Sequence, residues 1–206
     1  MDRNDLRKRL LKKAKEQIIE SLSEKEVHII KTIKLIEDLD EISNLLRENV
    51  LDWDKRSPTG NALRILTKLK LELNNLETER EEATQFVKDE MQSEFPEFSK
   101  LAGEILAAKL LATAGSKRKL AFVPASTIQV LGAEKSLFNH LKRRGQCPKH
   151  GHLFNHPLLQ KLPKQKRGKA ARIIAGKLSI AAKLDYFGKK SEINLLEEVE
   201  KKVNKL

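Results

Sequence analysis

The stretch ALRILTKLKLELNNLETEREEATQFVKDEM, residues 62–91, decides the fold class of this chain. Its apolar side chains recur three and four residues apart, with one polar interruption, along a seam of Leu66, Leu69, Leu73, Leu76, Arg80, Ala83 and Val87. This is the spacing of the a and d positions of a heptad repeat, and it predicts a long amphipathic helix. Thirty helical residues span roughly 45 Å.

A second long helix is predicted upstream, over residues 4 to about 53. Its start is more basic and carries a weaker pattern, with Leu6, Leu10, Ala14 and Ile18. Further on, the apolar positions again lie three and four apart, at Ile29, Ile33, Ile36, Leu39, Ile42, Leu46, Val50 and Trp53. Between the two helices, DKRSPTGN (54–61) contains Pro58 and Gly60, a strong stop signal.

Two long amphipathic helices joined by a tight turn predict an antiparallel coiled-coil hairpin over residues 1–91. Two ordinary helices of a compact bundle are the alternative, and the protruding hairpin is favoured. A single hairpin buries only a stripe of apolar side chains, so it needs another surface. A second copy of itself is the simplest choice, and we expect self-association.

The rest of the chain is also predicted to be helical, which makes the protein all-α. FPEFSKLAGEILAAKLLATAG (95–115) is the most apolar stretch and is expected to be one core helix ended by Gly115. Close packing of this helix is expected from its small residues, Ala102, Gly103, Ala107 and Ala108. AFVPASTIQVLG (121–132) is predicted to be a buried loop or a short extended segment.

Further helices are expected over residues 133–144, near 157–162 and within 162–188. The last of these would bury an inner face of Ala171, Ile174, Leu178, Ala181 and Ala182. The tail, residues 191–206, has an amphipathic pattern with Ser191 as a candidate N-cap. The predicted units are therefore the hairpin (1–91), a compact helical domain (92–190) and a C-terminal helix (191–206).

Positive charge is concentrated in one region. The 206 residues contain 41 Lys and Arg against 29 Asp and Glu, a formal charge of +12. Residues 117–190 alone hold 18 of the basic residues and only two acids, Glu134 and Asp185. This predicts an anionic partner, nucleic acid before membrane. No stretch approaches the roughly 18 apolar residues of a membrane span, and the charged N-terminus is unlike a signal peptide.

Histidines gather in CPKHGHLFNH (147–156), beside the chain's single cysteine, Cys147. This loop contains His150, His152 and His156, and His140 lies seven residues upstream of the cysteine. Zinc is one interpretation, but structural zinc sites use two ligand pairs on different elements. The favoured alternative is a basic irregular loop whose imidazoles bond to backbone, phosphate or bases.

No enzyme class is favoured by the sequence. Glycine-rich phosphate loops are absent, and the basic region lacks the carboxylate pair that two-metal or acid–base chemistry would use. A nucleophilic pair of Cys147 with His150 is disfavoured, because nothing around it resembles a hydrolase. A lone cysteine also excludes an internal disulfide framework and fits a reducing compartment. We expect a non-enzymatic protein without a cofactor or a metal.

One long segment, residues 126–187, is similar to the signature of the Nop domain. Its sequence is STIQVLGAEKSLFNHLKRRGQCPKHGHLFNHPLLQKLPKQKRGKAARIIAGKLSIAAKLDYF. The ordered motifs are GAEK, a Leu-Phe pair, PKHG, F-x-HP, RGK-x-AR and AA-x-x-D-x-F. The resemblance reaches upstream through KTIKLIEDLDEISNLLRENVLDW (31–53). Nop domain proteins include box C/D ribonucleoprotein scaffolds and a spliceosomal processing factor, and the archaeal box C/D scaffold is the most similar.

The resemblance implies partners and a mechanism. A small ribosomal-type protein would first fold an RNA kink-turn, and the Nop domain would dock on their composite surface. The coiled coil would join two scaffold copies, in support of guide-RNA-directed 2′-O-methylation. The expected location is the cytoplasm in an archaeon, and the nucleus or nucleolus in a eukaryote. The alternative is a protein-interaction adaptor, or a factor similar to the spliceosomal member, with no role in methylation.

The resemblance also implies RNA-facing residues, and the chain departs from the family pattern in three places. The expected contacts are Gly132, Ala133, Glu134, Lys135, Phe138, Lys142, Arg143, Arg144, Lys149, His150, Arg167, Lys169 and Arg172. Ser136 and Asn139 stand where relatives have the Ala and Arg of Ala-Leu-Phe-Arg, and Cys147 stands where proline is common. Only 30 residues precede 31–53, where the family has its fibrillarin-binding domain. A short paralogue, a truncated form or reliance on another subunit would explain this, and fibrillarin is expected to associate indirectly or not at all.

Overall fold

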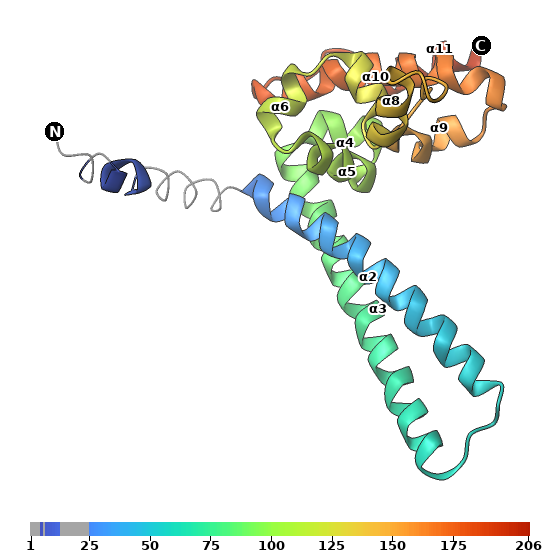
Figure 1. Ribbon diagram of the computed structural model, residues 1–206. Coiled ribbons are helices and arrows are strands. Elements are labelled where there is room, and N and C mark those ends of the chain that lie inside the picture. Colours follow the sequence, from blue (N-terminus) through green and yellow to red (C-terminus); the bar gives the residue numbers. More distant parts are fainter. Residues whose placement is uncertain (1–4, 6, 13–24) are drawn as a thin grey trace.

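The structure is a computed structural model that describes residue 5, residues 7–12 and residues 25–206. Within these residues every regular element is helical, which confirms the predicted all-α class. Figure 1 shows two long helices that project from a globular part formed by the residues that follow them, from 95 to 206. Of the helix predicted before residue 25, residues 7–12 are helical and the remainder lies outside the described residues.

The projecting pair consists of α2 (Lys25–Asp54) and α3 (Gly60–Glu94), which lie antiparallel and pack against each other. The break falls at the predicted turn, where Ser57 and Gly60 take positive φ angles of 50° and 59°. The expected seam of α3 is confirmed, because Leu66, Leu73 and Val87 are buried and Leu69, Leu76 and Ala83 are half-buried. The supercoil of a true coiled coil stays a prediction.

One position of the α2 seam was predicted wrongly. Ile42 is 54% exposed, and the neighbouring Ser43 takes its place in the buried stripe. The Ser43 hydroxyl is buried and has no hydrogen-bond partner. Ser43 lies seven residues from both Ile36 and Val50, so the buried stripe keeps a strict heptad spacing through a polar residue, and a prediction based on apolar residues alone moved this position to Ile42.

Ion pairs join the two helices along their exposed flanks. The polar interruption of the α3 seam, Arg80, donates to Asp40 of α2. Nearer the turn, Lys70 lies 2.8 Å from Asp54. These groups are about half exposed, so each pair contributes at most about 1 kcal/mol to stability and chiefly matches charge across the hairpin.

The apolar stretch 95–115 forms two helices, and the prediction of one continuous helix is wrong. The two helices are α4 (Pro96–Ala102) and α5 (Glu104–Ala114). Between them, Gly103 has φ 79° and ψ 145°, a conformation that a residue with a Cβ rarely adopts. A Cβ built on Gly103 would have no atom within 4 Å, so this glycine turns the chain and does not serve close packing.

The segment 121–132 is also helical, against the predicted loop or extended segment. It contains the end of α6 (Lys117–Phe122) and all of α7 (Ala125–Val130). Ser116 caps α6 by accepting a hydrogen bond from the Lys119 amide at 3.1 Å. Helices of six residues are too short to display a 3.6-residue period, which is why the apolar pattern did not identify them.

The long helix α10 (Lys164–Tyr186) runs through the globular part and packs on α4, α6, α7 and α11. Its predicted inner face is confirmed, because Ala171, Ile174, Leu178, Ala181 and Ala182 are all buried. The small alanines let neighbouring helices approach closely. Apolar residues at the base of α2 and α3 belong to the same core cluster, so the hairpin is rooted in the globular part.

Shorter elements complete the globular part. These are α8 (Glu134–Leu141), the 3-10 turn η1 (His152–Asn155) and α9 (Pro157–Gln160). The predicted helix 133–144 ends early, because Arg143 takes a left-handed φ of 57°.

The C-terminal helix α11 (Leu195–Asn204) begins later than predicted. Ser191 does not cap it, because its hydroxyl bonds to the backbone of Ile193. Asn194 is the cap, and its side-chain oxygen accepts from the amides of Leu196 and Glu197. Leu195, Val199 and Val203 are buried in the core shared with α10, so this helix packs as part of the globular unit.

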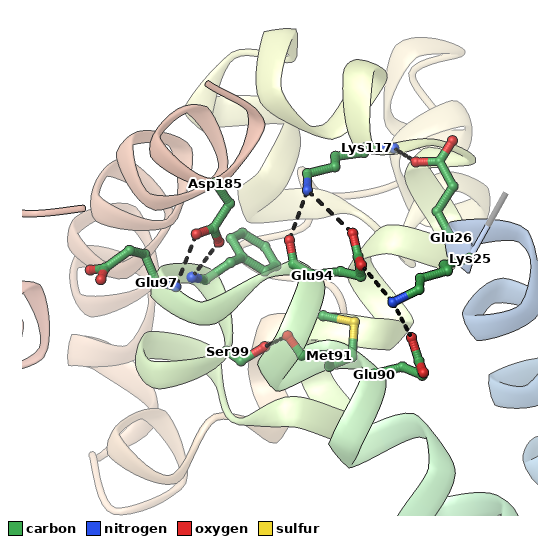
Figure 2. Close-up of polar contacts among 10 residues, drawn as sticks. Lys25, Glu26, Glu90, Met91, Glu94, Glu97, Ser99, Lys117 and Asp185 are labelled. Carbon is green, nitrogen blue, oxygen red and sulfur yellow. Dashed lines mark hydrogen bonds and ion pairs between the residues drawn. The ribbon is translucent and has the colours of Figure 1, made fainter. Parts of the chain in front are cut away.

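Polar contacts fix the hairpin to the globular part (Figure 2). Lys117 donates from its Nζ to the Glu94 carbonyl at 2.8 Å, and its backbone amide donates to Glu26 at 2.7 Å. Lys25 reaches Glu94 at 3.2 Å from the other side. The start of α6 therefore holds the base of both hairpin helices, since Glu26 belongs to α2 and Glu94 to α3.

A buried carboxylate supports the same junction from α10. Asp185 accepts hydrogen bonds from the amides of Glu97 at 3.0 Å and Phe98 at 2.8 Å, in the first turn of α4 (Figure 2). The two amides would otherwise be unpaired at the helix start. Burial raises the pKa of the Asp185 carboxyl, although the two N–H donors act in the opposite direction.

Candidate functional site

A groove in the basic region gathers three of the predicted contact residues, Lys149, Lys169 and Arg172. It lies between α7, α8, α10 and the loop before η1, and has a volume of about 690 Å³. None of its lining residues is acidic: they are Ser126, Thr127, Gln129, Val130, Leu137, Cys147, Pro148, Lys149, Gln165, Gly168, Lys169 and Arg172. Lys169 and Arg172 lie three apart on α10 and therefore share a face.

The loop carrying Lys149 is held tightly against the end of α7. The side-chain amide of Gln129 donates to the Lys149 carbonyl at 2.7 Å. The backbone carbonyl of Gln129 accepts from the Gly151 amide at 3.0 Å. A Cβ on Gly151 would lie 1.9 Å from the Leu131 carbonyl oxygen, so only glycine fits this approach. The position of Lys149 at the groove is thus set by backbone contacts.

The GAEK segment forms the tight connection between α7 and α8. Gly132 has φ 84°, and its amide donates to the Glu134 carboxylate at 2.7 Å. A Cβ on Gly132 would lie 2.4 Å from the His152 ring. Glu134 therefore has a partner within its own loop, Ala133 is the N-cap residue of α8, and Lys135 is exposed beside it.

The predicted residues at the end of α8 lie outside the groove lining. Phe138 is exposed, and the Lys142 ammonium sits 4.1 Å from its ring centre. Arg143 and Arg144 follow and are exposed. Leu137 of α8 lines the groove, so these side chains lie on or just after a helix that borders it.

Arg167 and His150 lie together on the ring of Phe154. His150 stacks on that ring with the centroids 5.1 Å apart, and the Arg167 guanidinium lies 5.2 Å from its centre. Arg167 also donates to the Leu162 carbonyl at 2.8 Å. Burial lowers the pKa of His150, and the positive charges of Arg167 and Lys149 lower it further. The ring is therefore biased toward its neutral form.

The remaining histidines and the cysteine point to different partners. His140 bonds to the Gly145 carbonyl, and His152 to the Thr113 hydroxyl, each at 3.0 Å. His156 is buried and bonds to the Leu101 carbonyl at 2.9 Å, whereas Cys147 is exposed. Within residues 25–206, no three side chains of the metal-binding types come together.

Sequence reasoning missed the uncharged half of the groove. Ser126, Thr127 and Gln129 belong to α7, the helix that the sequence did not reveal. Gln165 could have been found, because it precedes Lys169 by four residues and lies on the same face of α10. Hydroxyl and amide groups beside basic ones suit a ligand with both charged and neutral oxygens.

The chain is similar to known proteins over most of its length. Residues 12–205 match the model of the Nop family, described as a snoRNA binding domain, fibrillarin. A NOP5 family protein of Methanocaldococcus jannaschii is 46% identical over 144 residues, which cover 70% of this chain and 35% of the relative. Nucleolar protein 56 of Dictyostelium discoideum is 38% identical over 182 residues, covering 80% of this chain and 34% of that protein.

A solved structure is similar over almost the whole chain. In the crystal structure of a fibrillarin/Nop5p complex, one chain matches with a TM-score of 0.73 and 32% identity, covering 98% of this chain and 78% of that one. The expectation that fibrillarin associates indirectly or not at all is not borne out, because the family description and this complex both name fibrillarin.

Two further findings concern the length of this chain relative to its relatives and the search for a membrane-spanning helix. This chain spans only about a third of the length of the curated relatives it matches. In the described part of the chain, no helix is both long enough and apolar enough to cross a membrane. The family model covers nearly all residues, and the ordered motifs of 126–187 lie within the match. The chain belongs to the Nop family.

Proposed function

We propose that this protein is a non-enzymatic RNA-binding scaffold of a box C/D-type ribonucleoprotein. The observation that carries the proposal is the acid-free groove in which Lys149, Lys169 and Arg172 converge. Lysine and arginine provide charge for phosphates, and arginine can contact one phosphate through two N–H groups. Ser126 and Thr127 add hydroxyl groups that can bond to sugar or phosphate oxygens.

The RNA partner in this proposal is a kink-turn held by a small ribosomal-type protein. The basic residues at the end of α8, Lys142, Arg143 and Arg144, extend the surface beyond the groove, which suits a composite partner larger than one strand. The complex would support guide-directed 2′-O-methylation. Because the similar solved chain was found with fibrillarin, association with fibrillarin is part of the proposal. The cytoplasm of an archaeon, or the nucleolus of a eukaryote, is the proposed location.

The composite partner is tested by titrating kink-turn RNA with this protein in the presence and absence of a ribosomal-type kink-turn protein. We expect tight binding only when that protein is present. Equal affinity for the bare RNA would contradict the composite surface. Absence of binding in both arms, with retained binding to other proteins of the particle, would favour a protein-interaction adaptor.

The groove is tested by the salt dependence of the same binding reaction. Neutralising Lys169 and Arg172 to Gln should flatten the slope of log K against log salt by about 0.7 to 0.9 for each lost phosphate contact. A matched control replaces Arg64 and Lys68, two exposed residues of α3 with the same types of charge. An unchanged slope in the groove variant would place the RNA elsewhere.

Self-association through the hairpin is the second part of the proposal. Large apolar side chains are exposed on both hairpin helices: Leu35, Ile42, Leu45, Leu51, Leu63, Ile65, Leu71 and Phe86. Apolar side chains exposed on both helices of a chain that is 34% charged support the proposal that the hairpin contacts another protein surface. A second copy would cover these side chains and would place two grooves in one particle.

A further inference from the structure

Three aromatic rings form an exposed cluster at the end of α10, away from the groove. Phe122 of α6 makes edge-to-face contacts with Tyr186 and Phe187, with centroid distances of 5.4 and 6.2 Å, and the last two rings are 5.1 Å apart. Phe122 and Phe187 are each 59% exposed. The chain has only nine aromatic residues, so a third of them lie in a cluster that the core does not use.

Basic residues lie close to these rings along the chain. Arg118 and Lys119 belong to the same short helix as Phe122, and Lys183, Lys189 and Lys190 flank Tyr186 and Phe187. Among the described residues, none of these five cations forms an ion pair with a carboxylate. The nearby acid, Asp185, is buried and already holds the amides of α4. The cluster therefore presents apolar ring faces within a positive surface.

Aromatic faces combined with unpaired cations are the two features with which proteins hold unpaired nucleic acid. Bases stack on the rings, and the lysines and arginines follow the phosphates. A protein partner that covered three rings would meet positive charge without a carboxylate partner on this chain. We propose that Phe122, Tyr186 and Phe187 form a second RNA contact, which takes unpaired nucleotides of the RNA that is bound at the groove. This proposal rests on the RNA-binding function proposed above.

The two sites lie at opposite ends of the same helix. Lys169 and Arg172 are in the first half of α10, and Tyr186 is its last residue. Figure 1 shows α6 at one end of the globular part and α8 and α9 toward the other. Tyr186 lies fourteen positions after Arg172 along the helix, a distance of about 20 Å. A strand that advances about 3.4 Å per stacked nucleotide needs roughly six nucleotides to join the sites.

The experiment compares two RNAs in the assembled complex with the ribosomal-type protein. One ends at the kink-turn duplex, and the other carries a ten-nucleotide single-stranded extension with a 4-thiouridine. We expect the extension to increase the affinity of the natural protein about tenfold, the factor typical of one base stacked on an aromatic ring. The variant with Phe122→Leu and Phe187→Leu should lose this gain and bind the shorter RNA as before.

Controls separate this proposal from the groove proposal. Phe86→Leu replaces an exposed phenylalanine of the hairpin and should keep the gain. The Lys169→Gln, Arg172→Gln variant should lose affinity for both RNAs. The isolated extension oligonucleotide, crosslinked to the full chain, should attach within 117–122 or 183–190 even if groove binding fails. A gain unchanged by the two leucines, or crosslinks outside these segments, would overturn the proposal and leave the rings to a protein partner.

Discussion

His156 shows how a single residue of the histidine-rich loop acquires a structural role. Its Nδ1 accepts from the Leu158 amide at 3.2 Å, as the cap of α9, so its Nε2 must carry the proton donated to the Leu101 carbonyl at 2.9 Å. Both nitrogens are therefore used by the neutral ring. Burial lowers the pKa of His156 below the ordinary value of a histidine.

This arrangement predicts a loss of stability on acidification. The unfolded chain binds a proton at His156 near pH 6.5, whereas the folded ring does so only at lower pH. Unfolding therefore takes up a proton in this window, and the free energy of unfolding falls as the pH decreases through it. His156→Asn keeps an acceptor for the Leu158 amide, should cost about 1–3 kcal/mol at neutral pH, and should flatten the pH dependence.

The measurement is urea unfolding of both proteins at several values between about pH 5 and 7. His150→Asn is the comparison, because burial also lowers the pKa of that half-buried ring. We expect it to flatten the profile less, since the His150 ring stacks on Phe154 and caps no helix. Parallel profiles for natural and His156→Asn proteins would contradict a lowered pKa of His156 in the folded chain.

At the residue scale, the sequence predicted which side chains share a helical face. It did not predict the partners of side chains in loops, because the loop conformation determines them. Lys169 and Arg172 share a helical face, as their spacing predicted, and both line the groove, whereas their contact with RNA stays a prediction. Glu134 lies in the expected loop, but its carboxylate bonds to the Gly132 amide. Which partner each histidine takes depends on backbone carbonyls brought from distant helices, and no local pattern encodes them.

At the scale of elements, long periodic helices were predictable and short ones were not. The hairpin helices α2 and α3 and the core helix α10 each present an apolar stripe over many turns, which the sequence displays directly. In α6 and α7, caps and proline set the ends, and six residues cannot display a period. The uncharged half of the groove was missed for this reason.

Gly103 decides the division between α4 and α5, and its replacement gives an element-scale prediction. Gly103→Ala should destabilise the protein by about 1–3 kcal/mol, because φ 79° with ψ 145° is strained for any residue with a Cβ. Gly176→Ala is the matched control: it lies inside α10, without a positive φ and with nothing within 4 Å of the added Cβ. This control should stabilise the protein by about 0.5–1 kcal/mol.

Urea unfolding midpoints of the two alanine variants check this pair. A loss at Gly103 and a gain at Gly176 are the expected signs. If Gly103→Ala left the midpoint unchanged, the break between α4 and α5 would not depend on the glycine, and the chain would accommodate a straighter connection.

At the scale of the whole molecule, a protruding hairpin is joined firmly to a globular part. The core cluster continues from Ile29, Ile33 and Ile36 of α2 into the globular part, and Lys117 and Asp185 fix the junction at α4 and α6 (Figure 2). Farther out, the hairpin buries only a single stripe, and its outer side chains remain exposed. A firm junction would transmit the orientation of an associated hairpin to the groove.

The final prediction concerns the number of copies in the particle. Ile42 and Leu45 are 54% and 64% exposed on α2, so replacing both with lysine removes little buried surface from the single chain. We expect the natural protein to sediment as a dimer and the double lysine variant as a monomer with an unchanged unfolding midpoint. Charge placed in an apolar contact between two copies is strongly unfavourable unless it is paired.

The matched control for this prediction is Ile193→Lys, because Ile193 is 59% exposed but lies before α11 in the globular part. It should leave the dimer intact. Sedimentation velocity at several protein concentrations distinguishes the outcomes. A dimer held by the hairpin dissociates on dilution, whereas the double lysine variant sediments as a monomer at every concentration. A natural chain that stays monomeric at all concentrations would refute self-association, and dissociation by Ile193→Lys alone would move the interface to the globular part.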